Sequence, residues 1–511
     1  MNDQKKSQKE NSNDINQLLN TVIKYGPSIL QNRPLVKMAL STAEKWMLND
    51  NKKRHQTDLD TPGGVLDDKT ALSLAILNSV NRAVSEYKLS PATFRAASEV
   101  LGRDLFVEKK SRMEISEKFR EEYGFNSPSF LVISPSKACN LKCTGCYADS
   151  DENLKSLDWD LVDQIVTDAR NLWGTQFIVI SGGEPMAYRS QGKTILDLAE
   201  KHQDIFFMMY TNGTLITPEI AARMAKTGNI VPQISLEGWR ERTDKRRGEG
   251  VFDQVMTAMD NLFQAGVLFG FSLTATEENA EEILSEEFID FLFKEKHALI
   301  GWIFQYMPIG RAYTLDLMPT PQKRFWMWNQ TWKLIREKKV FLADFWNSGT
   351  VVDGCLSAGG HGNGGYLYIE WNGNVTPCVF VPYSPVNVKT IYERGGNLNN
   401  IYSEPFFANI RNWQKNRKGE SLLNPCLIRD HNVFLREIID QYHAQPIDQN
   451  ASSALQDPVY AEGMDRYATA YGQISNKVWD TVYLKNEPLT AEEFAEIAKI
   501  NSAEKAVLQK E

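Results

Sequence analysis

The sequence predicts an α/β protein built on a parallel sheet, and three observations support this. Six short apolar runs recur between residues 130 and 306, the stretches between them have helical periodicity, and the region before them has helical patterns only. Repeats of this kind form a parallel sheet with right-handed crossovers, either as a partial barrel or as a doubly wound sheet. Both architectures bind ligands at the carboxyl ends of their strands.

Each predicted strand is an apolar run that ends in polar or turn-forming residues. The predicted strands are 130–134, 177–181, 206–210, 230–236, 267–274 and 300–306. The main helices predicted between them are 159–173, 218–226, 252–265 and 281–297. The repeat stops near residue 315, where a Trp-rich helix predicted at 321–340 leads into a Gly-rich segment with short strands.

Length and composition narrow the class of protein. A chain of 511 residues favours two or three domains, and 42% hydrophobic with 24% charged residues is typical of a soluble globular protein. The net charge of -8 provides no broad basic face, so we expect no nucleic-acid partner. We see no apolar run long enough to span a bilayer and no signal peptide, and we therefore expect a cytoplasmic protein.

Composition shifts divide the chain into five predicted parts. These are a disordered tail (1–14), an N-terminal helical region (15–125), the α/β core domain (126–315), a C-terminal α+β domain (316–445) and a helical tail (446–511). The amphipathic stretch 18–48 carries Lys24, Arg33, Lys37 and Lys45, which would suit a membrane surface. A helix pair packed on the core is the favoured interpretation.

Three of the six cysteines are clustered where a site is expected. Cys139, Cys143 and Cys146 follow the first predicted strand in the loop at its carboxyl end, with the spacing Cys-x3-Cys-x2-Cys. In a reducing compartment such a cluster indicates metal and not disulfides. Structural zinc would need a fourth Cys or His nearby, and no histidine lies between His55 and His202. Three thiolates on a four-iron cluster leave one iron open to a small chelating ligand.

This cysteine motif resembles the signature of the radical S-adenosylmethionine (SAM) superfamily. The resemblance implies a partial (β/α)6 TIM-like barrel, a 4Fe-4S cluster on Cys139, Cys143 and Cys146, and SAM chelated to the open iron. It also implies that the reduced cluster splits SAM into methionine and a 5'-deoxyadenosyl radical, which abstracts hydrogen from a substrate. The family often has an aromatic residue before the third cysteine. Here that position is Gly145, and we expect Tyr147 to contact adenine instead.

The ends of the next strands carry motifs that match other elements of this family. Gly182, Gly183, Glu184 and Pro185 follow the second strand and resemble the family's GGEP element, which receives the ammonium group of SAM. By the same resemblance, Asn212 after the third strand lines the cofactor pocket. Ser235 and Glu237 at the fourth strand, with the nearby Arg247, are expected to contact the ribose or the methionyl carboxylate. The segments after the fifth and sixth strands, up to Arg311, are expected to face substrate.

The other three cysteines, Cys355, Cys378 and Cys426, are far apart in sequence. Scattered cysteines are often small buried hydrophobes. Cys378, however, ends a predicted hairpin with the pattern Gly-x4-Cys, which resembles the opening of the SPASM or twitch extension. That resemblance implies a smaller C-terminal iron-sulfur domain and one possible auxiliary 4Fe-4S cluster on these three thiolates. Asp430, His431, water or substrate would complete its ligands.

The leading interpretation is therefore a radical SAM enzyme that acts by hydrogen abstraction. The resemblance implies a peptide, a tetrapyrrole or another small molecule as substrate, and the amphipathic stretch 18–48 adds lipid as an alternative. It also implies a low-potential electron donor of the flavodoxin or ferredoxin type. The alternative is a non-catalytic iron-sulfur or zinc protein that senses redox state or carries electrons. The Gly182 to Pro185 motif favours the enzyme, because a sensor does not need it.

Overall fold

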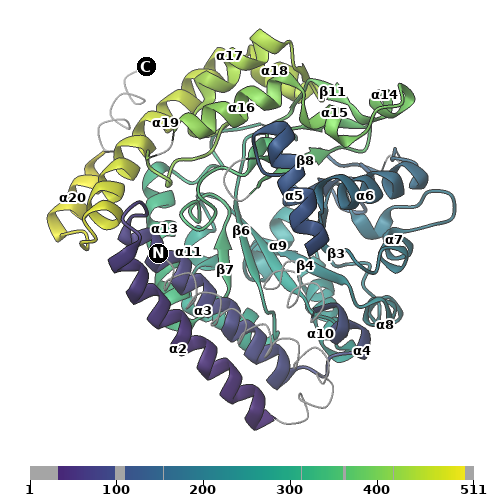
Figure 1. The fold of residues 1–511 in the computed structure, drawn as a ribbon, viewed down its shortest axis with the longest axis horizontal. Helices are drawn as coiled ribbons and strands as arrows, with labels where there is room; N and C mark the ends of the chain where they lie inside the picture. Colours follow the sequence, from purple (N-terminus) through teal and green to yellow (C-terminus); the bar gives the residue numbers. More distant parts are fainter. Residues whose placement is uncertain are drawn as a thin grey trace.

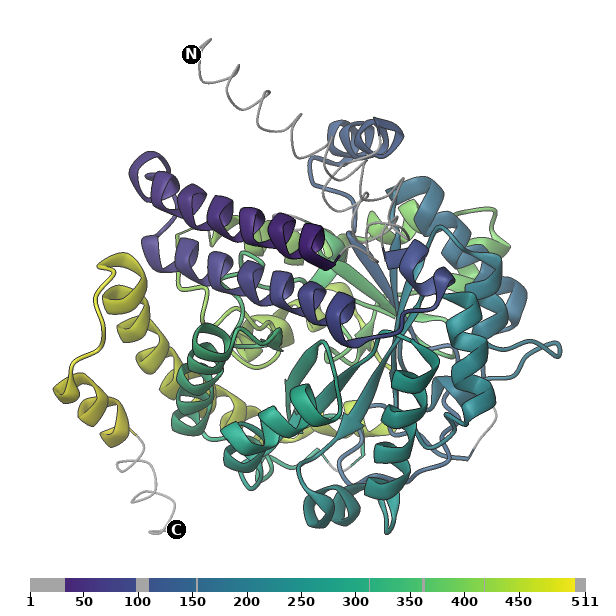
Figure 2. The same cartoon turned by 90° about the horizontal axis from the view of Figure 1, so that it is seen from below.

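The computed structural model describes residues 33–97, 110–152, 155–311, 313–360, 364–417 and 419–500. Within these ranges a ten-stranded sheet forms the centre of the molecule, and helices surround it (Figures 1 and 2). The predicted disordered tail 1–14, and residues 15–32 of the predicted N-terminal region, lie outside the described residues.

Six strands form the predicted parallel core, each paired with the next in chain order. They correspond to the six predicted apolar runs, with small shifts at the ends, so this part of the prediction is confirmed. The strands are β1 (Phe130–Ile133), β2 (Phe177–Ile180), β3 (Phe206–Thr211), β4 (Ile230–Leu236), β5 (Gly270–Ala275) and β6 (Gly301–Gln305).

The sheet curls into an open barrel, as a ring contact across it shows. Tyr210 on β3 and Phe304 on β6 are separated in the sheet by β4 and β5, yet their ring centroids are 5.3 Å apart. In a flat sheet these two strands would lie about 14 Å apart. Both side chains therefore face a common interior. Of the two architectures that the strand pattern allowed, the partial barrel is confirmed.

Helices cover the outer face of the barrel, and local signals set their ends. The predicted helices appear as α6 (Trp159–Trp173), α8 (Pro218–Thr227) and α10 (Val251–Ala265). Each is followed by a glycine with positive φ, a conformation that ends helices and favours glycine. Two shorter helices, α7 (Ile195–Lys201) and α9 (Arg240–Arg247), complete the crossovers up to β5.

The single helix predicted at 281–297 is wrong. The chain instead forms α11 (Ala280–Ile283), α12 (Glu286–Asp290) and a π-helical turn η3 (Phe291–Glu295). The break has a local cause, because the Ser285 hydroxyl accepts a hydrogen bond from the Phe288 N–H and starts a new helix. Hydrophobic periodicity continued across this break, so it did not reveal the cap.

Strands beyond residue 315 extend both edges of the same sheet. At one edge β7 (Leu342–Asp344) pairs in parallel with β6, and at the other β8 (Tyr366–Ile369) pairs in parallel with β1. The predicted hairpin is present, since β9 (Asn374–Thr376) pairs antiparallel with β8. The short strand β11 (Val386–Asn387) pairs antiparallel with the other side of β9. A separate two-stranded sheet joins β10 (Tyr383–Ser384) to β12 (Gln445–Pro446). The predicted boundary near 315 therefore does not interrupt the central sheet.

Helices from both ends of the chain pack together beside the barrel (Figure 1). Helix α2 (Arg33–Thr57), which holds the described part of the amphipathic stretch 18–48, packs on α3 (Gly63–Glu86), and the Ser79 hydroxyl of α3 donates to the Leu299 carbonyl just before β6. Asp68 of α3 is fully buried and accepts hydrogen bonds from Thr350 and Tyr483, each at 2.8 Å. No helix among the described residues is long and apolar enough to cross a membrane.

The remaining helices lie mostly in the C-terminal half. They are α4 (Pro91–Ala96), α5 (Lys110–Tyr123), α13 (Pro321–Lys338), α14 (Val388–Glu393), α15 (Leu398–Tyr402), α16 (Pro405–Asn416), α17 (Asn432–Tyr442), α18 (Gln449–Gln456), α19 (Pro458–Val478) and α20 (Ala491–Lys499). Helices α13 and α19 pack on each other beyond the β7 edge.

Candidate active site

The three clustered cysteines share one loop at the carboxyl end of β1. Cys139, Cys143 and Cys146 are all free thiols and partly exposed. Burial, together with charge on Cys143 and Cys146, raises the pKa of the Cys139 thiol to about 11, so the three thiols lie within electrostatic reach of one another. The donor set is therefore three sulfurs on one loop, as the motif predicts.

This donor set fits a multi-iron cluster better than a single ion. Thiolates on one tetrahedral zinc lie about 3.8 Å apart, whereas those on a four-iron cluster bind separate irons and stand farther apart. The three free thiols match the three protein ligands that such a cluster takes, with one iron left open.

Two glycines let the end of β2 pack directly on the cysteine loop. Gly182 has a φ of 108°, which favours glycine, and a Cβ on Gly183 would lie only 2.1 Å from the carbonyl oxygen of Ala138. The Glu184 N–H donates a hydrogen bond to that same oxygen at 2.7 Å. A side chain at Gly183 would push away the segment that carries Cys139. The turn therefore positions the loop.

Glu184 ties the ends of β2 and β3 together. Its buried carboxylate accepts hydrogen bonds from the Met186 N–H at 2.9 Å, the Thr211 hydroxyl at 2.6 Å and the Asn212 N–H at 2.7 Å. Burial raises the pKa of Glu184, and these three donors oppose that effect. Pro185 begins a short 3-10 turn after it. A carboxylate has about four acceptor positions, so one remains for a ligand.

Asn212 and Ser235 both lie at the carboxyl edge of the sheet, Asn212 directly after β3 and Ser235 near the end of β4. The Asn212 side-chain N–H2 donates to the Asn140 amide oxygen at 2.9 Å and lies 3.9 Å from the Cys139 sulfur. Ser235 shares a hydrogen bond of 3.2 Å with the Ser272 hydroxyl on the neighbouring strand. Asn212 therefore contacts the cysteine loop directly. The Ser235 hydroxyl is bonded to the neighbouring strand instead.

Glu237 and Arg247, both predicted to bind the cofactor, bind each other. The Arg247 Nε and Nη2 donate to Glu237 Oε1 at 2.9 and 2.6 Å, and Arg246 donates to the same oxygen at 2.5 Å. Burial disfavours the Arg247 charge, but the Glu237 carboxylate keeps the pKa of Arg247 above its usual value. Arg246 also donates to the Thr144 carbonyl at 3.1 Å. Arg247 is therefore engaged by a carboxylate of the chain itself, and Arg246, held by the same Glu237 oxygen, braces the cysteine loop.

The segment directly after β6, which the sequence analysis assigned to substrate contact, holds the cysteine loop in place through hydrogen bonds from Arg311. The Arg311 N–H donates to the Cys146 carbonyl at 2.9 Å, and its guanidinium donates to the carbonyls of Cys143, at 2.8 Å, and Ser150. Gly310 has a φ of 65°, and a Cβ there would lie 2.5 Å from the Cys146 carbonyl oxygen. The Gly-Arg pair after the sixth strand was the only sequence signal for this contact.

Arg311→Ala should loosen the first cysteine loop without removing any thiol. Charge-assisted hydrogen bonds are each worth about 1.5 to 3 kcal/mol, so we expect iron in a chelator challenge to be lost about ten times faster or more. Anaerobic incubation of reconstituted protein with an iron chelator measures this rate. Arg240→Ala is the matched control, because Arg240 forms an exposed ion pair with Asp253 away from the loop. Equal rates in the two variants would contradict this role of Arg311.

Tyr306, and not Tyr147, fills the space beside Gly145. A Cβ on Gly145 would lie 2.7 Å from the Tyr306 ring, and Tyr306 is 2% exposed. Tyr147 instead turns toward β2, where its hydroxyl lies 2.5 Å from that of Ser181. The sequence analysis named Tyr147 because it is adjacent to the third cysteine. The missing aromatic side chain at position 145 is replaced in space by a residue distant in sequence.

The barrel interior contains accessible space next to this loop. Interior side chains near the carboxyl ends of β3 to β6 are partly exposed, whereas their outward-facing neighbours are fully buried under the helices. Phe380 reaches across this space, with its ring 6.0 Å from Phe304 and 5.9 Å from Tyr147. The space therefore has aromatic walls. The partly exposed side chains that line it are Tyr210, Ser235, Thr274, Trp302 and Phe304.

The second set of cysteines also converges, although its members are far apart in sequence. Charge on Cys355 raises the pKa of both Cys378 and Cys426, and burial is the larger cause at each. The Tyr366 hydroxyl lies 2.8 Å from the Cys378 sulfur, and the Cys355 thiol lies 3.2 Å from the Ser357 hydroxyl. Three thiols with hydroxyl groups beside two of them form a second candidate cluster site.

Asp430 and His431, considered as fourth ligands for this site, are engaged elsewhere. Both carboxylate oxygens of Asp430 accept from the buried Arg324, at 2.5 and 3.1 Å, and this ion pair keeps the pKa of Asp430 low despite burial. The Asp430 carboxylate also accepts from the Cys426 N–H at 3.0 Å. The His431 Nε2 lies 2.9 Å from the Asn424 carbonyl oxygen. Asp430 is therefore committed to Arg324, and His431 is engaged through its Nε2.

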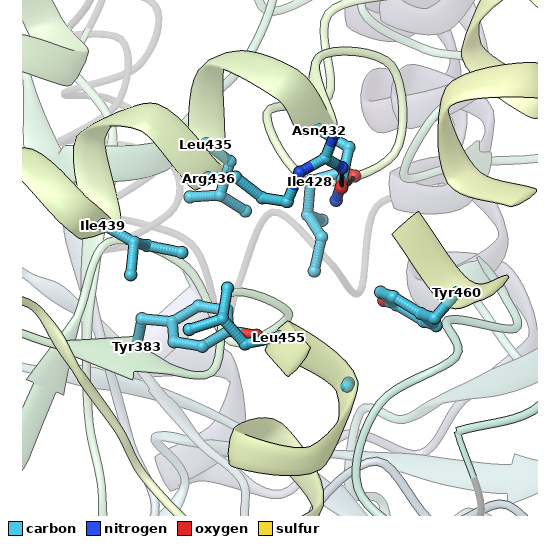
Figure 3. A pocket seen from close by; sticks show the side chains of 9 residues that line it. Tyr383, Ile428, Asn432, Leu435, Arg436, Ile439, Leu455 and Tyr460 are labelled. Atoms are coloured by element: carbon cyan, nitrogen blue, oxygen red, sulfur yellow. Dashed lines mark hydrogen bonds between the residues drawn. The ribbon is translucent and has the colours of Figure 1, made fainter. Parts of the chain in front are cut away.

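A small pocket lies apart from both cysteine sites, between α17, α18 and α19 (Figure 3). Its walls are mainly apolar, with Arg436 at its upper side. Arg436 is paired with Asp465 at 2.7 and 3.1 Å and also contacts Asn432. The pocket lining therefore presents no uncommitted charge, and we assign it no chemistry. Its lining residues are Tyr383, Ile428, Asn432, Leu435, Arg436, Ile439, Ala454, Leu455 and Tyr460.

The structure is a partial parallel barrel with three thiols at its carboxyl edge, and comparisons with known proteins show what it is similar to. Residues 133–291 match the model of the radical SAM superfamily. The mycofactocin maturase MftC of Mycolicibacterium smegmatis is 28% identical over 57% of this chain and 74% of its own length. The AdoMet-dependent heme synthase of Methanosarcina barkeri is 24% identical over 60% of this chain and 89% of its own. The solved Streptococcus suis SuiB bound to SAM is 17% identical over 70% of this chain and 87% of that one, with a TM-score of 0.48.

Residues 133–291 of the chain form a radical SAM domain, and the chain is a radical SAM enzyme. This class uses a 4Fe-4S cluster and SAM. The non-catalytic sensor or electron carrier that the sequence left open is not favoured.

Proposed function

We propose that Cys139, Cys143 and Cys146 hold the catalytic 4Fe-4S cluster and that SAM binds beside them at the Gly182 to Pro185 turn. One observation carries this assignment: the backbone of that turn is hydrogen-bonded to the loop that holds the three thiols. A ligand of the cluster's open iron would therefore lie next to the turn. When bound, the cluster and SAM supply a 5'-deoxyadenosyl radical that removes hydrogen from the substrate.

The chain's own residues orient and shield this site. The remaining acceptor position of Glu184 would receive the ammonium group of SAM, beside Asn212. Tyr306 would form a wall of the cofactor space at Gly145. The Glu237 and Arg247 pair, with Ser235, would line the opposite side, while Arg311 keeps the cysteine loop in place. Tyr147 would face the barrel interior and not adenine.

We propose that Cys355, Cys378 and Cys426 hold one auxiliary 4Fe-4S cluster. Their convergence across 71 residues of sequence supports this, as does the Tyr366 hydroxyl beside Cys378, because hydrogen bonds to cluster sulfurs tune reduction potential. Asp430 and His431 would be second neighbours and not ligands. Water or substrate would take the fourth iron.

The substrate enters the aromatic-walled interior of the barrel. A peptide is the favoured class, because the relatives include a mycofactocin maturase and the sporulation killing factor maturation protein SkfB of Bacillus subtilis. A tetrapyrrole is the second candidate, which the heme synthase relative supports. The electron donor would be a low-potential flavodoxin or ferredoxin in the cytoplasm, where free thiols persist.

Anaerobic reconstitution tests this function directly. Protein supplied with iron, sulfide, a strong reductant and SAM should release 5'-deoxyadenosine, measured by chromatography, at a rate that depends on both SAM and reductant. Omitting iron and sulfide serves as the control. Protein that binds iron but forms no 5'-deoxyadenosine under these conditions would refute the assignment.

A further inference from the structure

Glu370, directly after β8, is a buried acid whose carboxyl accepts no hydrogen bond from any described residue. It is 7% exposed, and only burial and through-space charges act on its carboxyl. The strand register shows where it points. β8 pairs with β1, β1 with β2 and β2 with β3, and the pairing carries the face of Tyr210 across to Tyr368 and Glu370. Glu370 therefore belongs to the barrel interior.

Two tyrosines and one lysine lie within electrostatic reach of this carboxyl. Tyr368 and Tyr147 are both within electrostatic reach of Glu370, and Phe380 packs against the Tyr147 ring at 5.9 Å. Lys137 is the facing cation, and it also lies 3.7 Å from Asp149 and 3.9 Å from Asp151. Lys137 is thus shared among several acids and does not pair with Glu370 at salt-bridge distance.

The charges around Glu370 leave it short of positive partners. Burial and the nearby Asp448 raise the pKa of Glu370 to about 8, and Lys137 opposes them only in part. The tyrosines Tyr147 and Tyr368 are the other titratable groups that face it. A buried carboxyl without a partner is costly, and a cation brought in by a ligand would relieve that cost.

We propose that Glu370 binds a cationic group of the substrate, an ammonium or guanidinium, inside the barrel. Tyr147 and Tyr368, which lie within electrostatic reach of Glu370, are aromatic residues of the kind that can also bind a cation. At neutral pH, Glu370 would release its proton to solvent as the ion pair forms, with no other bond made or broken. This inference rests on the proposed function, because it treats the interior as the substrate site.

A small amine can probe this site without knowledge of the substrate. The probe is 2-phenylethylamine, and its neutral analogue 2-phenylethanol is the control ligand. An alkylammonium stays protonated well above pH 8, so any change with pH reports the protein. A raised carboxyl pKa means that Glu370 becomes charged as pH rises through about 8. Amine affinity for the reconstituted enzyme should therefore increase about twentyfold from pH 6.5 to 8.5, measured by anaerobic calorimetry, while 2-phenylethanol binding stays constant.

Two variants at this site make the test decisive. Glu370→Gln keeps the shape and breaks no hydrogen bond, so it should fold normally and lose the pH dependence, with at least tenfold weaker amine binding at pH 8.5. Asp448→Asn removes the nearby negative charge and should move the midpoint of the pH dependence downward. Glu393→Gln, an exposed carboxyl on α14, should behave as wild type.

Equal amine binding by wild type and Glu370→Gln would overturn the cation site. That result is distinguishable from failure of the proposed function, because 5'-deoxyadenosine formation by the wild type is measured without the amine. Conversely, pH-dependent amine binding by a protein that forms no 5'-deoxyadenosine would support the cation site and refute the radical chemistry.

Discussion

Replacing Cys139, Cys143 and Cys146 together by alanine should reduce 5'-deoxyadenosine formation to the level seen without enzyme. These three thiols are the proposed protein ligands of the cluster. We expect a loss of at least a hundredfold in the anaerobic cleavage assay, because the electron would have no route to the cofactor.

Lys142→Ala is the matched control for this experiment, since Lys142 is an exposed residue of the same loop. It should retain both the iron and the cleavage rate. Undiminished 5'-deoxyadenosine from the triple variant would show that the cofactor is cleaved elsewhere, and the central assignment would be wrong.

Replacing Cys355, Cys378 and Cys426 by alanine should remove about half of the iron. Two four-iron clusters correspond to about eight irons per reconstituted chain, so about four should remain in this variant and about four in the variant that lacks the first three cysteines. Iron analysis and electron paramagnetic resonance of both proteins measure this partition. The thermal stability of the C-terminal region should also fall, because metal binding is coupled to folding.

Ser357→Ala is the control for the second site, because Ser357 contacts the Cys355 thiol without being a proposed ligand. It should keep about eight irons. About four irons in the wild type, with none left once the first three cysteines are removed, would identify Cys355, Cys378 and Cys426 as ordinary buried thiols.

The central sheet could be predicted because its signals are local. Each core strand is an apolar run, since both faces of a parallel strand in this barrel are covered, and each run ends where the chain turns. The boundaries of α6 were readable for the same reason, with Gly174 directly after Trp173. The π-helical turn at Phe291–Glu295 was missed because hydrophobic periodicity continues across it.

The partners of charged side chains were harder to predict. Arg247 was expected to bind a carboxylate of the cofactor, and it binds the Glu237 carboxylate of the chain. Asp430 was considered as a cluster ligand, and it pairs with Arg324, which lies 106 residues away in sequence. Residue type identified the chemistry in both cases, but a buried charge pairs with whichever opposite charge the fold brings to it.

The sequence by itself determined the positions of the six core strands, the spacing of the first three thiols and the glycine turn after the second strand, because these depend on neighbouring residues. Only the tertiary structure decided which distant side chains complete the site. The closing of the barrel brings Tyr306 beside Gly145 and Arg311 onto the cysteine loop, and it gathers Cys355, Cys378 and Cys426 into one group. It also turns Glu370 into the interior through the pairing of β8 with β1. These contacts join strands and loops across the barrel, and no local pattern encodes them.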